Sequence, residues 1–211
     1  MWFAIVLTIL TGYMLGNLNG AVSISNLLAK KDVRDQGSGN AGLTNFLRMF
    51  GPSSALLVVC VDMLKAILAC QVGRLLLTPY DCAMDGVLIG GMAVCVGHIF
   101  PALLGFHGGK GVLSGVTVAL MADWRLGLLA LAIFAVCLAI SRYVSLSSIL
   151  GTLSFVIVFP ILYGGESPLA AVLGALLGLL IIFMHRSNVG RLLKGNERKA
   201  TFSKFKKKNN S

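Results

Sequence analysis

The sequence predicts an all-α membrane protein with seven transmembrane helices, the fourth of them short, an external N-terminus and a cytoplasmic C-terminus. The first observation is composition, because 56% of the 211 residues are hydrophobic, 12% are charged and the mean hydropathy is +0.85. Soluble domains carry about 25% charged residues, so this chain is too apolar for a soluble enzyme, a disordered protein or a disulfide scaffold. The other two observations are a series of long apolar stretches and a one-sided distribution of basic residues.

Seven apolar stretches are candidates for membrane crossing, which needs about 20 mostly apolar residues. Their approximate ranges are 2–28, 52–77, 84–104, 111–122, 124–141, 145–163 and 169–184. The first stretch has no basic residues before it, is long and contains Asn17 and Asn19, so we interpret it as a retained helix rather than a signal peptide. The stretch 111–122 is short for a crossing, and a re-entrant segment is the alternative.

The basic residues favour a full crossing by this fourth segment. With seven crossings, 15 of the 18 Lys and Arg residues share one side, in segments 29–51, 105–110, 142–144 and 185–211. The positive-inside rule makes that side cytoplasmic. Without the fourth crossing, Arg142 and the C-terminal tail would lie on the side opposite Lys30 and Lys110. We therefore expect a short helix that is extended by the glycine-rich loop before it.

The chain is expected to form one membrane domain over residues 1–193, followed by a basic cytoplasmic tail over residues 194–211. The net charge is +10, and much of it belongs to this tail, which holds Lys194, Arg198, Lys199, Lys204, Lys206, Lys207 and Lys208. Basic clusters beside a membrane crossing typically face the anionic headgroups of the lipid bilayer. No recognition fold accompanies the cluster, so no nucleic-acid partner is expected.

A few charged and thiol side chains lie within the apolar stretches. Asp62 and Lys65 are three residues apart on one helix face and can form a pair. A charge inside a membrane usually marks function, but a self-neutralising pair that fixes helix packing is an equal alternative. The five cysteines have no CxxC spacing, so we interpret the four within apolar stretches as packing residues and leave Cys82 unassigned.

A first polar motif at the cytoplasmic edge covers residues 37–48, begins Gly-Ser-Gly-Asn-Ala-Gly-Leu-Thr-Asn and ends at Arg48. It contains the G-x-G-x-x-G spacing of dinucleotide-binding proteins, but those proteins need a buried strand before the first glycine. The charged residues 30–36 exclude such a strand. The motif still predicts a backbone of small residues whose N–H groups can turn toward an anion, with hydroxyl and amide side chains beside it.

The second motif covers residues 97–111 and ends in Gly-Phe-His-Gly-Gly-Lys-Gly. A Walker A loop built on Lys110 would need a glycine where Leu104 stands and a hydroxyl residue where Gly111 stands, so nucleotide binding is not indicated. Glycines around a lysine nevertheless suit a phosphate, because the backbone approaches closely and the lysine supplies a point charge. A flexible loop between two helices is the alternative.

The third motif covers residues 185–197, begins His-Arg-Ser-Asn-Val-Gly-Arg and ends Gly-Asn-Glu. His185, Asn188 and Arg191 follow one another at three-residue intervals, so they would share one face of a helix that continues from the last crossing. Glu197 is expected to anchor this stretch by pairing with a neighbouring arginine. A single histidine at a membrane edge is usually only an interfacial residue.

Together, the three motifs resemble those of the bacterial acyl-phosphate:glycerol-3-phosphate acyltransferase family, which are polytopic enzymes of phospholipid synthesis. The resemblance runs from about residue 12 to residue 197, and Asp62-x-x-Lys65 resembles a further family signature. It also implies seven spans and an external N-terminus. The chain departs from the family in its first helix, where Gly-Asn-Leu-Asn at residues 16–19 replaces the usual Gly-Ser-Ile-Pro.

The resemblance implies transfer of a fatty acyl group from acyl-phosphate to the 1-hydroxyl of glycerol 3-phosphate, giving lysophosphatidic acid and phosphate at the cytoplasmic side of the bacterial inner membrane. It further implies an upstream enzyme that supplies acyl-phosphate, and no cofactor or metal. The implied catalytic residues are Ser38, Arg48, Lys110, His185 and Asn188. The implied substrate-binding residues are Gly37, Gly39, Asn40, Gly42, Thr44, Asn45, Gly108, Gly109, Gly111 and Arg191. Glu197, Asp62 and Lys65 are expected to be structural.

The motifs leave the acceptor of the hydroxyl proton open. The fifth residue after each histidine is Leu103, Val112 or Gly190, so no His–Asp dyad of that spacing occurs, and the chain has no G-x-S-x-G motif. We expect a substrate phosphate to accept the proton while Ser38, Arg48 and Lys110 position and neutralise the substrates. A histidine base is the alternative.

Two other functions are alternatives to an acyl-phosphate-dependent acyltransferase. A small transporter or channel for an anionic solute predicts internal repeats and broken helices that meet at the middle of the membrane. We find no convincing repeat in the sequence, and the polar motifs lie at one edge. The second alternative is an acyltransferase that uses acyl-CoA as its donor, and only the family resemblance argues against it.

Overall fold

The computed structural model describes residues 1–200, in which the chain forms helices and no strand, as the sequence predicts. Four basic residues of the expected tail lie outside the described residues, namely Lys204, Lys206, Lys207 and Lys208. The longer helices are α1 (Trp2–Asn17), α4 (Pro52–Leu77), α5 (Ala83–Ile99), α7 (Trp124–Ser141), α8 (Val144–Tyr163) and α9 (Pro168–Phe183). The shorter ones are α2 (Gly20–Ala29), α3 (Leu43–Phe50), α6 (Val112–Ala122) and α10 (Arg186–Leu193), with 3-10 turns at Val33–Asp35, Thr78–Tyr80 and Ala102–Leu104.

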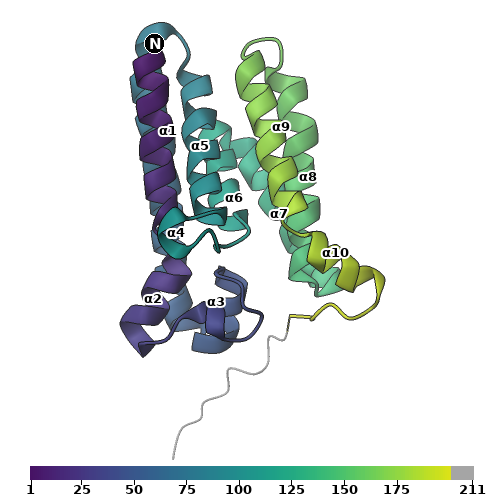
Figure 1. The fold of residues 1–211 in the computed structure, drawn as a ribbon. Helices are drawn as coiled ribbons and strands as arrows, with labels where there is room; N and C mark the ends of the chain where they lie inside the picture. Colours follow the sequence, from purple (N-terminus) through teal and green to yellow (C-terminus); the bar gives the residue numbers. More distant parts are fainter. Residues whose placement is uncertain (201–211) are drawn as a thin grey trace, which may run out of the picture.

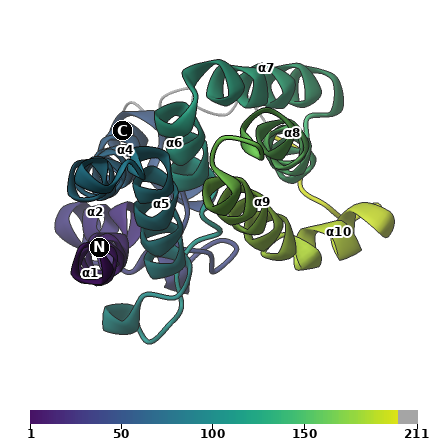
Figure 2. The ribbon, with the colours of Figure 1, turned by 90° about the horizontal axis from the view of Figure 1, so that it is seen from above.

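The long helices form one bundle whose two ends differ (Figure 1). α5 lies at the centre, packed against α1 and α4 and, on its other side, against α6 and α9 (Figure 2). α7 and α8 complete the bundle beyond α6 and α9. The N-terminus lies at one end of the bundle, whereas α2, α3 and α10 gather at the other end. The three polar motifs adjoin these short helices, so they share the end opposite the N-terminus.

Close helix packing depends on glycine at two contacts of α5. A side chain on Gly86 would overlap the backbone of Gly73 on α4, and a side chain on Gly73 would overlap Gly86 in return. Three turns further along the same face of α5, Gly97 makes a similarly close contact with Gly16 of α1. Apolar burial gives helices no driving force to associate in lipid, so small residues that let backbones approach supply the packing energy instead.

The first span differs from the single helix expected over residues 2–28. α1 ends at Asn17 and α2 begins at Gly20, with two extended residues, Leu18 and Asn19, between them. The side chain of Asn19 causes this restart, because it caps α2 by accepting a hydrogen bond of 3.0 Å from the N–H of Val22. The first span is therefore a broken helix, and Asn17 and Asn19 lie at the break.

The buried pair of Asp62 and Lys65 satisfies the polar groups at this break. The Lys65 Nζ to Asp62 Oδ1 distance is 2.7 Å, which confirms the expected pairing. Lys65 donates to the carbonyl oxygen of Leu18 at 2.7 Å, near the negative end of α1, and Asp62 accepts from the N–H of Gly20 at 3.1 Å, at the positive end of α2. Backbone groups in lipid must be satisfied within the protein, so the pair completes the broken helix.

Five helical segments in residues 1–200 are long and apolar enough to cross a membrane, and a sixth is added if α9 and α10, bent by 50°, count as one span. The broken segment Trp2–Ala29 qualifies as a whole. α6 forms a helix as expected, but its 11 residues span only about 16 Å, roughly half of the hydrocarbon core of a bilayer. The all-helical architecture of a membrane protein is therefore confirmed.

Candidate active site

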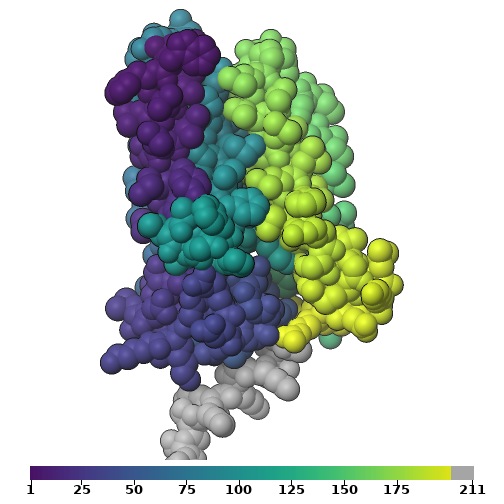
Figure 3. All heavy atoms as spheres, in the orientation of Figure 1, coloured from purple at the N-terminus to yellow at the C-terminus, as the bar shows by residue number. Residues whose placement is uncertain are grey.

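The three polar motifs surround one cavity of about 680 Å³ at the end of the bundle where α2, α3 and α10 lie. Figure 3 shows the region of α10, in yellow, beside the region of α2 and α3 at this end. The expected site residues on the wall of the cavity are Gly37, Ser38, Asn40, Gly42, Thr44, Asn45, Arg48, Asp62, Lys110, Gly111, His185, Asn188, Arg191 and Glu197. The expected residues Gly39, Lys65, Gly108 and Gly109 are not on that wall.

Four helices begin at this cavity, and none of the four has a side-chain cap. α3, α6, α8 and α10 each place first-turn residues on the wall, and their N-terminal N–H groups receive no side-chain hydrogen bond. A helix N-terminus carries about half a positive charge together with free N–H donors. The four helix starts therefore add to the arginines and the lysine to make the polar end of the cavity attractive to anions.

A hydrogen-bonded chain joins the second motif to the third. Lys110 Nζ donates to Asn188 Oδ1, and Asn188 Nδ2 donates to Glu197 Oε1 at 2.6 Å. Glu197 also accepts from Ser145 Oγ at 2.7 Å and pairs with Arg191 Nε at 2.7 Å, which confirms the expected ion pair. The carboxylate of Glu197 thus connects the side chains of both motifs.

The charges of this cluster act on one another. Burial lowers the pKa of Lys110 to about 8, and the positive charges of Arg191 and Arg48 add to this effect against the opposing charge of Glu197. Burial also lowers the pKa of Arg48, with the charge of Arg198 acting in the same direction. Although burial raises the pKa of Glu197, hydrogen bonds from Asn188, Ser145 and Arg191 lower it overall. The site therefore holds an excess of positive charge that an anionic ligand would relieve.

The third motif does not continue the last span as one helix, which corrects the expectation. α9 ends at Phe183 and α10 begins at Arg186, so the chain bends between them and His185 becomes the N-cap residue of α10. The bend turns α10 across the end of the bundle, and His185 and Asn188 are buried at the cavity while Arg191 stays exposed. The three side chains still reach one cavity, although not as a stripe on a straight helix.

His185 has a defined proton position. Its Nδ1 lies 2.8 Å from the carbonyl oxygen of Ile181, so Nδ1 carries the hydrogen and Nε2 is left as an acceptor. Burial lowers the pKa of His185, and the charge of Lys110 adds to this effect against the hydrogen bond to Ile181. The ring is therefore neutral at neutral pH and presents an acceptor nitrogen on a residue of the cavity wall.

The first motif is held by the side chain of Asn45. Its Oδ1 accepts from the N–H of Ser38 at 2.9 Å, and its Nδ2 donates to the carbonyl oxygens of Val33 and Gln36, both at 3.0 Å. Gly37 adopts a positive φ of 64°, and a side chain there would overlap Asn45. The loop is thus preorganised, with the hydroxyl of Ser38 exposed at the cavity and the polar atoms of Asn45 already used within the protein.

The glycines of the second motif act differently from the expected phosphate cradle. The N–H of Gly108 donates to the carbonyl oxygen of Ile99 at 3.2 Å, and that of Gly109 donates to the carbonyl oxygen of His98 at 3.1 Å. A side chain on either glycine would overlap neighbouring atoms of the protein. These two N–H groups therefore shape the loop that carries Lys110, and the donors of the site come from the helix starts and the cationic side chains.

The cavity has an apolar arm that enters the bundle between α6, α7, α8 and α9. Its walls include Leu113, Val116, Ala119, Leu131, Phe134, Phe155, Leu177 and Ile181. Along α8 the lining runs from Ser145 to Phe155, a rise of about 15 Å. One cavity thus combines a cationic end with an apolar arm long enough for part of a hydrocarbon chain.

Several cavity residues are not among the expected site residues. Ser148 lies one turn beyond Ser145 on α8, and both serines are buried at the wall. Arg198 also lines the cavity, although the sequence assigns it to the tail. His98 lies on the wall as well, with Nδ1 2.8 Å from Lys65 Nζ. The three-residue spacing of Ser145 and Ser148 at the start of a span could have indicated that they share one face of the helix. Nothing in the sequence distinguished Arg198 from the other basic residues of the tail.

Together, the fold and the site define an all-helical integral membrane protein with a cationic cavity that continues into an apolar arm. The family model described as glycerol-3-phosphate acyltransferase matches residues 6–195. A glycerol-3-phosphate acyltransferase of Thermoanaerobacter pseudethanolicus is 40% identical over 92% of this chain and 94% of its own length, and one of Finegoldia magna is 36% identical over 89% and 91%. The chain belongs to the glycerol-3-phosphate acyltransferase family.

A solved structure agrees with this assignment. The crystal structure of PlsY (YgiH), an integral membrane glycerol 3-phosphate acyltransferase in its glycerol 3-phosphate form, superposes with a TM-score of 0.82 and 30% identity. The match covers 93% of this chain and 96% of that one. The lysophosphatidic acid form of the same protein superposes with a TM-score of 0.80. The chain is therefore a membrane acyltransferase, and its family places it in phospholipid synthesis.

Proposed function

We propose that this enzyme transfers a fatty acyl group from acyl-phosphate to the 1-hydroxyl of glycerol 3-phosphate, forming lysophosphatidic acid and inorganic phosphate. The observation that carries the proposal is the shape of this cavity, which joins a cationic end to an apolar arm. An acyl-phosphate has the same two parts, an anionic head and a hydrocarbon chain. The structural relative was solved in glycerol 3-phosphate and lysophosphatidic acid forms, which correspond to a substrate and a product of this reaction.

Charge supports two phosphates at the polar end. Each phosphate monoester carries about −1.5 to −2 charges near neutral pH, so two phosphate groups side by side repel each other strongly. Arg48, Lys110, Arg191 and Arg198 line the same end of the cavity, where four helix starts add partial positive charge. These positive charges would let the two anionic substrates bind side by side. Holding both substrates in one complex contributes much of the catalysis, because a bimolecular reaction then proceeds within that complex.

The proposed reaction needs no strong protein base. The hydroxyl oxygen of glycerol 3-phosphate forms a bond to the acyl carbon, the bond between that carbon and the phosphate oxygen breaks, and the departing phosphate takes the hydroxyl proton. Neutral His185 would orient the hydroxyl through its acceptor Nε2. A His185→Ala variant should therefore keep measurable turnover. Complete loss of turnover with intact substrate binding, together with a histidine-like pH profile, would favour a histidine base instead.

The donor is tested with purified protein in detergent, supplied with glycerol 3-phosphate and, in turn, an acyl-phosphate, an acyl-CoA or an acyl carrier protein thioester. We expect lysophosphatidic acid with equimolar phosphate from acyl-phosphate alone. A Lys110→Ala variant purified in the same way controls for contaminating hydrolases and should be inactive. Equal activity with a thioester, or no activity with any donor, would contradict the proposal.

We also propose seven crossings of a bacterial plasma membrane, with the N-terminus outside, the active site on the cytoplasmic side, and one domain through residue 193 followed by the basic tail. α6 supports this count, because it begins after Gly111 at the polar end of the cavity and ends before Asp123, one turn beyond the apolar lining residue Ala119. Asp123 accepts a hydrogen bond of 2.8 Å from Tyr163 at the end of α8. Asp85 near the start of α5 accepts one of 2.8 Å from Ser167 just before α9. The end of α6 therefore lies with the turn between α8 and α9, at the end of the bundle opposite the polar motifs.

A further inference from the structure

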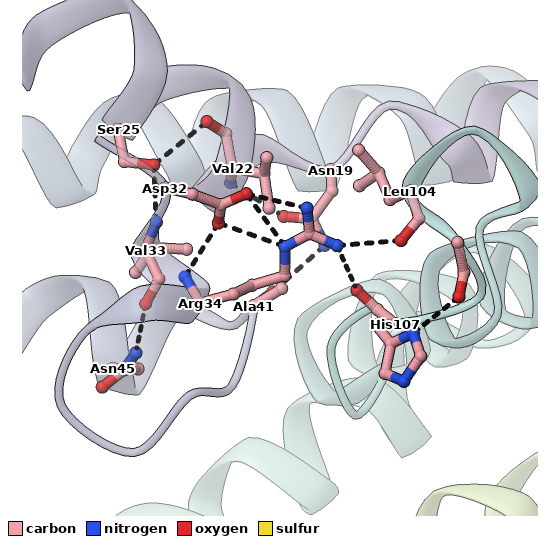
Figure 4. Close-up of polar contacts among 11 residues, drawn as sticks. Asn19, Val22, Ser25, Asp32, Val33, Arg34, Ala41, Asn45, Leu104 and His107 are labelled. Atoms are coloured by element: carbon pink, nitrogen blue, oxygen red, sulfur yellow. Dashed lines mark hydrogen bonds and ion pairs between the residues drawn. The ribbon is translucent and has the colours of Figure 1, made fainter. Parts of the chain in front are cut away.

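Arg34 forms an ion pair that the motifs do not include. It follows Asp32 by two residues, within the 3-10 turn Val33–Asp35. Asp32 Oδ2 lies 2.7 Å from Arg34 Nη2 and 3.0 Å from its Nε, and Asp32 Oδ1 accepts from the backbone N–H of Arg34 at 2.8 Å. Figure 4 shows this fork, in which the carboxylate holds one edge of the guanidinium and leaves the other edge free to point away.

The free edge reaches the second motif. Arg34 Nη1 donates to the carbonyl oxygens of Leu104 at 2.8 Å and His107 at 3.3 Å (Figure 4). These two carbonyls flank Gly105 and Phe106, which both have positive φ and form the sharp turn of the loop. A single guanidinium therefore holds both sides of the turn that precedes Lys110.

The segment around Arg34 is itself rigidly anchored. The N–H of Val33 donates to Ser25 Oγ of α2 at 3.1 Å, and its carbonyl oxygen accepts from Asn45 of α3 at 3.0 Å (Figure 4). Asn45 also holds the N–H of Ser38. Arg34 therefore links the loop of Lys110 to the same small framework that positions Ser38.

The charges of Asp32 and Arg34 stabilise their ion pair. The hydrogen bond to Asp32 raises the pKa of Arg34 further, against the effect of burial, so its charge is permanent. The hydrogen bond from Arg34 in turn lowers the pKa of Asp32, against the effect of burial. An arginine fork spanning a carboxylate and two carbonyls uses more donors than a lysine can supply.

We propose that Arg34 is a positioning residue for glycerol 3-phosphate binding. It fixes the loop of Lys110 relative to Ser38 and Arg48, so that cations from two motifs reach the same phosphate without further ordering on binding. The inference rests on the proposed function, in that Lys110 serves the phosphate of the acyl acceptor. Without the hydrogen bonds from Arg34, this loop would sample other positions. Ordering it when the substrate binds would then cost free energy and weaken binding.

The chain contains its own matched control. Asp123 and Arg125 repeat the same spacing and fork at the opposite end of the bundle, with Arg125 Nε donating to Asp123 Oδ1 at 3.0 Å and Nη2 to Asp123 Oδ2 at 2.8 Å. Within residues 1–200, however, the guanidinium of Arg125 hydrogen-bonds only to this carboxylate and holds no second loop. Removing Arg125 takes away the local pair without touching the active site.

The test compares Arg34→Gln, Arg34→Lys and Arg125→Gln in the full-length protein, purified in the same detergent. Steady-state kinetics should give a KM for glycerol 3-phosphate that rises about tenfold in Arg34→Gln, as expected for loss of hydrogen bonds from a charged group, with the KM of the acyl donor nearly unchanged. Arg34→Lys can still reach one carbonyl and should be intermediate. Arg125→Gln should match the wild-type protein.

Hydrogen exchange of peptides covering residues 100–111 reports on the loop directly. Exchange should become faster in Arg34→Gln and stay unchanged in Arg125→Gln. An unchanged KM and unchanged exchange in Arg34→Gln would overturn the proposal, and so would an equal rise in KM for Arg125→Gln. If Arg34→Gln does not fold, Arg34→Lys decides by the same two measurements. A wild-type protein that does not acylate glycerol 3-phosphate would refute the proposed function, whereas the exchange data would still decide whether Arg34 holds the loop.

Discussion

Lys110 is a site cation whose charge changes near physiological pH, because its pKa is lowered to about 8 by burial and by the neighbouring Arg191. The second pKa of a phosphate monoester is about 6, so glycerol 3-phosphate is fully charged above neutral pH. We expect kcat/KM for glycerol 3-phosphate to be highest near pH 7 and to fall as the pH rises through about 8, where Lys110 loses its proton.

A Lys110→Arg variant is the control for this profile. Arginine stays charged at all accessible pH values, so its kcat/KM, although lower overall because the hydrogen bond to Asn188 is altered, should not fall above pH 8. A wild-type profile that stays flat into the alkaline range would show that the charge of Lys110 does not contribute to substrate binding.

The sequence predicted residue contacts where the partners are near each other in the chain. Asp62 and Lys65 are separated by three residues, and Arg191 and Glu197 by six, and both pairs form. Contacts between residues that are far apart in the sequence could not be predicted. Ser145 binds Glu197 from 52 residues away, a contact that depends on how α8 packs and not on any local pattern.

At the scale of helices, the contact between α4 and α5 depends on Gly86. A side chain there would overlap the backbone of Gly73, which cannot move away as a flexible side chain could. Overpacking a tight contact typically costs about 1–3 kcal/mol, so Gly86→Val should lower the melting temperature by roughly 3–10 °C in a thermal unfolding assay in detergent.

Gly165 supplies the comparison for that variant. It lies in the turn between α8 and α9 with open space around the position of a side chain, and its φ is not in the left-handed region. Gly165→Ala should leave the melting temperature unchanged. An equal loss of stability in both variants would mean that glycine content, rather than the α4–α5 contact, controls the stability of the bundle.

Helix existence was predictable from the sequence, but helix breaks were not. The apolar stretches of about 20 residues gave the long helices at nearly their observed positions. The break at Asn19 and the bend before Arg186 both went unpredicted. The break depends in part on Asp62 and Lys65, distant residues that satisfy its backbone groups.

At the scale of the whole molecule, the crossing of α6 decides the topology. Full crossing places Lys31 and Glu166 on opposite sides of the membrane, whereas a re-entrant α6 would place them on the same side. We expect Glu166→Cys to react with a membrane-impermeant maleimide in intact cells, and Lys31→Cys to react only after the cells are permeabilised. Labelling of both in intact cells, or of neither, would contradict seven crossings.

The parent protein for this labelling should lack reactive native thiols. Cys60 is exposed, and Cys82 and Cys137 are partly exposed, so these three are replaced by serine. Cys70 and Cys95 are buried in the hydrophobic core and can remain. The unlabelled parent gives the background against which the two introduced cysteines are measured.

The sequence by itself determined that this protein is a helical membrane protein, because apolar stretches of that length have no other stable arrangement in a bilayer. It also identified three motifs suited to anions, because glycines and basic residues at short spacing are a local property. Only the tertiary structure decided that four uncapped helix starts meet at one cavity, that this cavity has an apolar arm, and that Arg34 joins two motifs. These features depend on contacts between distant parts of the chain, and the packing of α5 against its neighbours brings those parts together.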